Sequence, residues 1–191
     1  MPYLDSDALK KIGFKSLGKG VKISDKAAIY NPEQMEIGDF SRVDDFCVLS
    51  GQIKIGRNVH IAPMSLIAGG EKGITLSDFS GLAYHVQIFT QSDDYSGLTL
   101  TNPTVPKKYK RERKLAVYIG RHVIIGAGSI VFPGVHLADG CSVGAMSLVH
   151  QSTESWGVYV GNPAKRVSER RKKLLELEQQ YLTEADNNGP L

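Results

Sequence analysis

The 191-residue chain lacks the features that mark several large classes of protein. It has only two cysteines, Cys47 and Cys141, which are too few for a disulfide framework. No apolar run reaches membrane-spanning length, and no signal peptide is recognisable at the N-terminus. The net charge is only +3, which indicates neither a nucleic-acid-binding protein nor a membrane protein. We therefore expect a cytoplasmic protein with one domain and a core of ordinary size.

What the sequence does have is an aliphatic residue at every sixth position through most of its length. The two long series are Ile37, Val43, Leu49, Ile55, Ile61 and Ile67, and then Ile119, Ile125, Val131, Leu137, Val143 and Val149. A period of six fits neither an amphipathic helix nor an alternating strand. It is typical of a chain that turns a corner every six residues and stacks three-sided coils. The sequence therefore predicts an all-β fold, the left-handed parallel β-helix of hexapeptide repeats.

A second period supports the first, because small or β-branched residues stand four positions after most of the aliphatic ones. Members of this series include Ser41, Val59, Ser65, Val86, Val123, Ser129, Val135 and Ser147. A corner that brings backbone close to backbone has room only for such side chains. Cys47 and Cys141 belong to the same series, so we expect both to be buried and unpaired.

Breaks in the period divide the chain into segments. We expect a helical cap over residues 1–18, which covers the open first coil, and the β-helix over residues 19–160. The period stops over residues 91–117, which predicts a long inserted loop, and such a loop in a compact fold is usually functional. A C-terminal α-helix is expected over residues 161–183, followed by a disordered tail over residues 184–191.

Three motifs in the last third, Ile125–Val131, Val143–Val149 and Gly161–Val167, resemble the hexapeptide-repeat acyltransferases, close to the galactoside and maltose O-acetyltransferase branch. The segment Ser92–Gly97, followed by Thr101–Thr104, is similar to a subgroup from bacterial O-antigen and capsule gene clusters. The resemblance implies a homotrimer, with acetyl-CoA as co-substrate in the groove between neighbouring subunits. Closed threefold packing of flat-sided columns agrees with this expectation.

The same resemblance implies which residues contact acetyl-CoA. Small side chains in one column would let the backbone approach the pantetheine arm, and basic side chains would meet the phosphates. The residues implied for the pantetheine wall are Ala127, Ala145, His150 and Gln151. Those implied for the phosphates are Lys165 and Arg166.

The catalytic base is where this sequence departs from the family. The family has a histidine at the start of the long loop, and the matching position here is Asp93, next to Asp94. One hypothesis is that His85 is the base, oriented by one of these carboxylates, even across the subunit interface. The other is that the acceptor is an amine, which needs little more than positioning and a carboxylate to accept its hydrogen.

The resemblance implies an acetyl-CoA-dependent acetyltransferase that modifies a sugar or nucleotide-linked amino sugar in bacterial surface polysaccharide biosynthesis. Two alternatives stay open: O-acetylation of a free acceptor such as a galactoside, and a non-catalytic scaffold. The basic run Lys107–Lys114 would suit a nucleotide diphosphate. A carbonic anhydrase would need three converging histidines, but His122, His136 and His150 are spaced out of step with the coil, so no metal is expected.

Overall fold

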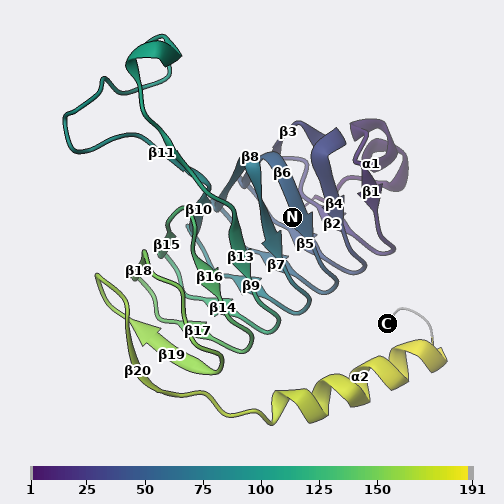
Figure 1. Ribbon diagram of the computed structural model, residues 1–191. Coiled ribbons are helices and arrows are strands. Elements are labelled where there is room, and N and C mark those ends of the chain that lie inside the picture. The colour runs from purple at the N-terminus through teal and green to yellow at the C-terminus, as the bar shows by residue number, and fades with distance from the viewer. Residues whose placement is uncertain (1, 189–191) are drawn as a thin grey trace.

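The computed structural model describes the backbone of residues 2–188 and the side chains of residues 2–184. The chain forms a three-sided column of stacked parallel strands, which confirms the predicted parallel β-helix (Figure 1). We name the sides face A, face B and face C, in the order in which the chain passes along them. Two long strands, β6 (Val48–Ile55) and β8 (Leu66–Leu76), bend from face C into face A.

The strands of each face pair in parallel from one coil to the next. Face A contains β1 (Ser16–Leu17), β4 (Met35–Ile37), the second halves of β6 and β8, β13 (Val117–Ile119) and β16 (His136–Leu137). Face B contains β2 (Lys22–Ile23), β5 (Arg42–Val43), β7 (His60–Ile61), β9 (Gly81–Leu82), β14 (Ile124–Ile125), β17 (Ser142–Val143) and β19 (Gly157–Val160). Face C contains β3 (Ala28–Tyr30), the first halves of β6 and β8, β10 (Gln87–Phe89), β15 (Ile130–Val131) and β18 (Leu148–Val149).

The core consists of the inward-pointing aliphatic residues of the six-residue period. Residues of successive coils stack directly, as Ile61 does on Leu82 and Ile125 on Val143. These four side chains are 0–3% exposed. Complete burial of one such side chain stabilises the fold by about 1.5–3 kcal/mol, so the repeated column supplies the main stabilising contribution.

The small residues of the second period lie at the corners, as predicted. Cys47 and Cys141 are buried and free, and the Cys47 thiol lies 3.1 Å from the carbonyl oxygen of Ala62 in the next coil. The Ser41 and Ser129 hydroxyls donate to carbonyl oxygens of the next coil at 2.7 and 2.9 Å. Small polar groups therefore satisfy corner carbonyls that the strands leave without a partner.

Helix α1 (Ser6–Ile12) lies at the N-terminal end of the column. The Asp5 carboxylate caps it by accepting the backbone N–H groups of Asp7 and Ala8 at 3.1 and 2.8 Å. Leu9 is buried against the first coil, where it joins the core. The helix therefore covers apolar residues that no preceding coil would cover.

The inserted segment leaves the column at the corner between face C and face A and projects from it (Figure 1). Its base is an antiparallel pair formed by β11 (Gln91–Ser92) and β12 (Arg113–Lys114). The short 3₁₀ helix η2 (Lys107–Tyr109) lies in the projecting part. A second 3₁₀ helix, η1 (Pro32–Gln34), accommodates the extra residues of an earlier corner.

The expected start of the C-terminal helix is wrong. Residues Lys165–Glu169 form strand β20, which pairs antiparallel with β19, because the turn at Gly161–Ala164 sends the chain back along face B. Helix α2 then begins at Leu174 and continues to Asn188, through most of the expected disordered tail. The rest of that tail, residues 189–191, lies outside the described residues. Neither helix of the described chain has the length and hydropathy needed to cross a bilayer.

Candidate active site

Asp93 lies at the base of the inserted loop, directly after β11. Its side chain is partly buried, and its Oδ2 accepts the backbone N–H of Asn102 at 3.2 Å. Its other carboxylate oxygen has no hydrogen-bond partner among the described residues. Asp93 therefore presents a carboxylate that is fixed on one side and open on the other.

Asp94 has different surroundings, although it is the next residue. Its Oδ1 accepts the backbone N–H of Ser96 at 2.8 Å, and its Oδ2 accepts the Thr99 hydroxyl at 3.0 Å. Hydrogen bonds from Ser96 and Thr99 lower the pKa of Asp94 below its ordinary value. Both oxygens of Asp94 are thus used to shape the loop, which leaves it a weaker proton acceptor than its position suggests.

A hollow of about 340 Å³ adjoins the two aspartates, and it is lined by Asp93, Asp94, Tyr95, Arg111, Glu112 and Arg113. Two lysines of the basic run are already paired with acidic residues. Lys110 and Lys114 lie 3.1 and 3.3 Å from the Glu112 carboxylate, and Lys114 also lies 2.9 Å from Glu71. The basic run therefore has less free positive charge than its composition indicates.

His85 lies at the corner between face B and face C, with a left-handed backbone at φ 59°. Its side chain is exposed, and its backbone N–H donates to the Pro63 carbonyl at 3.1 Å. Strand β10 separates His85 from Asp93, which lies at the next corner. Among the described residues, no hydrogen bond or ion pair joins His85 to Asp93 or Asp94, so the chain by itself does not bring the three together.

Ala127 and Ala145 lie one above the other at the same corner as His85. The backbone N–H of Met146 donates to the Ala127 carbonyl at 2.8 Å, which links the two corners. Lys165 is the first residue of β20 and pairs with Val160, near the C-terminal end of the β-helix. Its side chain is exposed. Ala127, Ala145 and Lys165 therefore follow one line along the column.

The other residues expected at the cofactor lie elsewhere. His150 and Gln151 are exposed at the corner between face C and face A, directly after β18. The Arg166 guanidinium lies 2.9 Å from Glu154 and 2.5 Å from Glu169, so its charge is compensated. Arg166 is therefore less available to a phosphate than Lys165, the other expected ligand.

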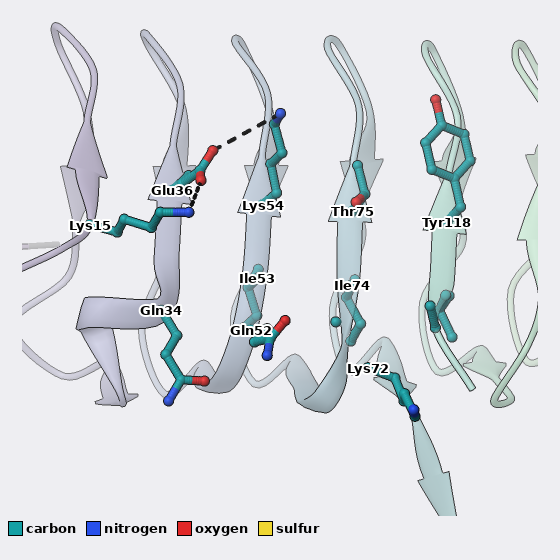
Figure 2. Close-up of a pocket in the computed structure, with 13 residues that line it drawn as sticks. Lys15, Gln34, Glu36, Gln52, Ile53, Lys54, Lys72, Ile74, Thr75 and Tyr118 are labelled. Carbon is teal, nitrogen blue, oxygen red and sulfur yellow. Dashed lines mark hydrogen bonds and ion pairs between the residues drawn. The ribbon is translucent and has the colours of Figure 1, made fainter. Parts of the chain in front are cut away.

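A separate hollow of about 320 Å³ lies on face A (Figure 2). Glu36, Lys54, Thr75 and Tyr118 stand in a row on successive parallel strands, as Figure 2 shows. Lys15 and Lys54 lie 2.6 and 4.0 Å from the Glu36 carboxylate. This surface is polar and partly charge-paired, and none of the expected site residues lines it.

The sequence analysis missed a charged cluster on face B, formed by Tyr3, Arg42, Asp44 and His60. Asp44 is only 1% exposed and contacts all three other residues. The available signal was the spacing of eighteen residues between Arg42 and His60, which places them on adjacent strands of one face. The three histidines considered as metal ligands are confirmed to lie apart. His122 lies at the corner between face A and face B, His136 lies on face A, and His150 lies just beyond face C.

The fold is a parallel β-helix of six-residue repeats, with an acidic loop base at one corner and a line of small residues at another. No protein-family model matches the chain. The chain is 49% identical over 181 residues to dTDP-4-amino-4,6-dideoxy-D-glucose acyltransferase from Escherichia coli, which covers 93% of this chain and 94% of that protein.

Solved structures agree with this similarity. AntD, an N-acyltransferase from Bacillus cereus, in complex with dTDP and 3-hydroxybutyryl-CoA, matches with a TM-score of 0.95 and 44% identity over 96% of this chain and 98% of that chain. A variant of AntD in complex with dTDP-4-amino-4,6-dideoxyglucose and coenzyme A matches with a TM-score of 0.94 and 45% identity over 95% and 98%. The chain therefore belongs to the hexapeptide-repeat acyltransferase family, and it is an enzyme that takes its acyl group from a coenzyme A thioester.

Proposed function

We propose that the protein transfers an acetyl group from acetyl-CoA to the amino group of a nucleotide-linked amino sugar, dTDP-4-amino-4,6-dideoxyglucose. The observation that carries this proposal is the 49% identity, over 93% of the chain, to the E. coli acyltransferase named for that sugar. The similarity to AntD bound to the same nucleotide sugar supports it independently. We assign this reaction to the biosynthesis of a bacterial surface polysaccharide. We place the enzyme in the cytoplasm, because its two free cysteines fit a reducing compartment.

Asp93 is the proposed proton acceptor. An aliphatic amine carries a proton near neutral pH and attacks only after losing it. The open oxygen of Asp93 takes this proton, and the neutral nitrogen attacks the thioester carbonyl to form a tetrahedral intermediate. The intermediate collapses to the amide as the nitrogen loses a second proton and the C–S bond breaks, and the departing coenzyme A thiolate takes up a proton in turn. Asp94 positions the loop that carries Asp93, because both of its own oxygens are engaged by Ser96 and Thr99.

We propose that the active enzyme is a homotrimer. Large apolar side chains are exposed along the corner between face B and face C, and exposed apolar surface of this kind marks contacts between proteins. These side chains are Phe46 (55% exposed), Met64 (50%), Tyr84 (61%) and Met146 (76%). Packing this corner against a neighbouring subunit would bring His85 of one copy toward Asp93 of the next, where His85 is proposed to help orient the acceptor or the carboxylate.

The coenzyme A arm is proposed to follow the column of Ala127 and Ala145, with its phosphates at Lys165. His150 and Gln151, which lie at another corner, are proposed to contact it from the neighbouring subunit. Arg166 is retained as a weaker candidate for the phosphates, since Glu154 and Glu169 compensate its charge. Small side chains let backbone groups approach the ligand closely, and a lysine supplies a point charge for a phosphate.

The proposal is tested by thiol release from acetyl-CoA in the presence of different acceptors. We expect turnover with dTDP-4-amino-4,6-dideoxyglucose and at least about 10²-fold lower kcat/KM with a galactoside. Faster turnover with the galactoside would favour O-acetylation of a free acceptor. The assay includes 3-hydroxybutyryl-CoA as a second donor, because AntD is known in complex with that thioester.

A further inference from the structure

The charged cluster on face B is built around a buried carboxylate. Oδ1 of Asp44 accepts the Tyr3 hydroxyl at 3.1 Å and lies 3.0 Å from Nε of Arg42. Oδ2 accepts from the Arg42 guanidinium at 3.1 Å and lies 2.7 Å from Nε2 of His60. A buried carboxylate is tolerated only when its charge is paired and its oxygens are hydrogen-bonded. Asp44 therefore fixes the Arg42 and His60 side chains from the buried side of the cluster.

The outer parts of Arg42 and His60 remain accessible. Their side chains are 42% and 43% exposed, whereas that of Asp44 is 1% exposed. Lys22, Arg42 and His60 stand on adjacent parallel strands, so they form a row with one rung about 4.8 Å from the next. Asp44 takes the Nε–Nη2 edge of Arg42, and Nη2 also lies 2.8 Å from Nε2 of His60, so Nη1 is the nitrogen of the guanidinium that is left to donate to a phosphate group.

An apolar hollow of about 230 Å³ begins where this row ends, beside His60. It is lined by His60, Ala62, Gly81, Leu82, Ala83, Tyr84 and Ile124. Gly81 follows His60 in the same row, and its missing side chain leaves the space open. A Cβ at Gly81 would meet nothing within 4 Å, and its φ is not positive, so neither packing nor backbone conformation requires glycine there. The consequence of glycine at this position is the hollow itself.

We propose that Lys22, Arg42 and His60 bind the diphosphate of the nucleotide-linked sugar, with the deoxy end of the sugar in the hollow beside Gly81. This inference rests on the proposed function, because it assigns the acceptor of that reaction to face B. The diphosphate meets the cations Lys22 and Arg42 and the His60 imidazole, and the apolar hollow takes a methyl group better than a hydroxymethyl group. Tyr84, which lines the hollow, precedes His85, so the sugar lies beside the corner at which the subunits are proposed to meet.

The positive charge of this row is better suited to a diphosphate than that of the inserted loop. Lys110 and Lys114 of the loop are paired with Glu112 and Glu71. On face B, one carboxylate lies beneath Arg42 and His60, and Lys22 forms no ion pair among the described residues. The row thus keeps a net positive charge at its surface, while the buried carboxylate faces inward.

The first test is binding of dTDP to the full-length protein by calorimetry. Arg42→Lys keeps a charge for Asp44 but has no second nitrogen for the phosphate, and we expect it to weaken dTDP binding about tenfold. His60→Gln is expected to do the same, while the Kd for coenzyme A stays within about twofold. Lys22→Ala is expected to weaken dTDP binding about threefold, whereas Lys54→Ala, a strand lysine on face A, leaves it unchanged.

The second test concerns the hollow and does not disturb the charged cluster. Gly81→Val fills the space, so we expect it to raise KM for dTDP-4-amino-4,6-dideoxyglucose at least about tenfold, with the Kd for dTDP unchanged. Ser142→Val lies in the same row beyond the hollow and is the matched control, expected to behave as the wild type.

The outcomes separate this inference from the proposed function. If the wild type acetylates the nucleotide sugar but Arg42→Lys, His60→Gln and Lys22→Ala bind dTDP with unchanged affinity, the assignment of face B is overturned and the proposed function stands. If Gly81→Val leaves KM unchanged, the hollow does not hold the sugar. If the wild type binds dTDP through these residues but does not acetylate the sugar, the proposed reaction fails and the diphosphate site stands.

Discussion

At the scale of single residues, two adjacent aspartates differ in their hydrogen bonds, and we therefore propose separate roles for them. Asp94 uses both oxygens to hold the turn of the inserted loop, and its pKa is lowered by those bonds from Ser96 and Thr99. Asp93 keeps one oxygen open toward the hollow. An open carboxylate can accept a proton from an incoming ammonium group, whereas a saturated one mainly fixes geometry.

The substitution Asp93→Asn therefore removes the proposed proton acceptor while keeping the shape of the side chain. We expect kcat to fall about 10²-fold or more, with little change in the Kd for coenzyme A. Asp94→Asn is expected to raise KM and to lower kcat less than Asp93→Asn does. Steady-state kinetics with the nucleotide amino sugar, together with Tm for each variant, provide the measurement.

His85 provides the comparison that decides whether Asp93 or His85 is the base. If Asp93 is the proton acceptor, His85→Ala lowers kcat less than Asp93→Asn does. A loss of 10²-fold or more in His85→Ala, with a smaller loss in Asp93→Asn, would assign the base to His85 instead.

At the scale of elements, helix α2 is held to the column by a compact polar contact. Glu178 accepts hydrogen bonds from Arg121 and His122, and Tyr181 packs edge-on against Phe79. The Tyr181 hydroxyl also accepts the Asn58 amide at 3.0 Å. Burial raises the pKa of Glu178, but the hydrogen bonds from Arg121 and His122 outweigh it, so the pKa is lowered overall.

A lowered pKa makes the docking of α2 depend on pH. Glu178 stabilises the folded state above the unfolded pKa of glutamate, about 4.3, and this contribution is lost as the pH falls through the lower folded pKa. We expect Glu178→Gln to lower Tm at pH 7, and the difference from the wild type to shrink as the pH falls below about 4. Glu184→Gln, at an exposed position of the same helix outside its first turn, is the control and leaves Tm unchanged at every pH. A constant difference between Glu178→Gln and the wild type would contradict the account.

Some elements of the fold could be predicted from the sequence and others could not. The coils were predictable, because each aliphatic residue such as Ile125 stacks on the equivalent residue of the next coil, and the period records that stacking directly. Strand β20 was not predictable, because all five residues of Lys165–Glu169 are exposed and only pairing with β19 makes them a strand.

The candidate site likewise contains residues that could be predicted from the sequence and contacts that could not. Asp93 could be placed at the loop base because it lies at a fixed distance from the last coil residue. The spacing of eighteen residues could have placed Arg42 beside His60, but the contact of Asp44 with Tyr3 could not be found, because no period links residues so far apart in the sequence. Contact of His85 with Asp93 stays a prediction, since it needs a second subunit.

At the scale of the whole molecule, the surface of the column is uneven. Face A is polar and partly charge-paired, α2 covers the corner between face A and face B, and apolar side chains are exposed between face B and face C. Closed symmetry is the usual outcome when one such surface packs against another copy. The B–C corner is therefore the surface at which we expect the trimer to form.

Met146→Asp tests this expectation. Met146 is 76% exposed and has a left-handed backbone, which aspartate tolerates well, so the substitution is expected to leave the fold intact. We expect it to convert a trimer to monomers, measured by light scattering after size-exclusion chromatography, with loss of activity. Leu177→Asp, at an apolar position 54% exposed on α2, is the control and stays trimeric. If the Met146→Asp variant stays trimeric, the interface does not lie at the B–C corner.

The most direct measurement is the position of the acyl group in the product. The purified protein is incubated with acetyl-CoA and dTDP-4-amino-4,6-dideoxyglucose, and the product is examined by NMR and mass spectrometry alongside the amount of thiol released. We predict one acetyl group on the sugar nitrogen, as an amide, for each thiol released. An ester on a sugar hydroxyl, or thiol release without an acetylated sugar, would contradict the account.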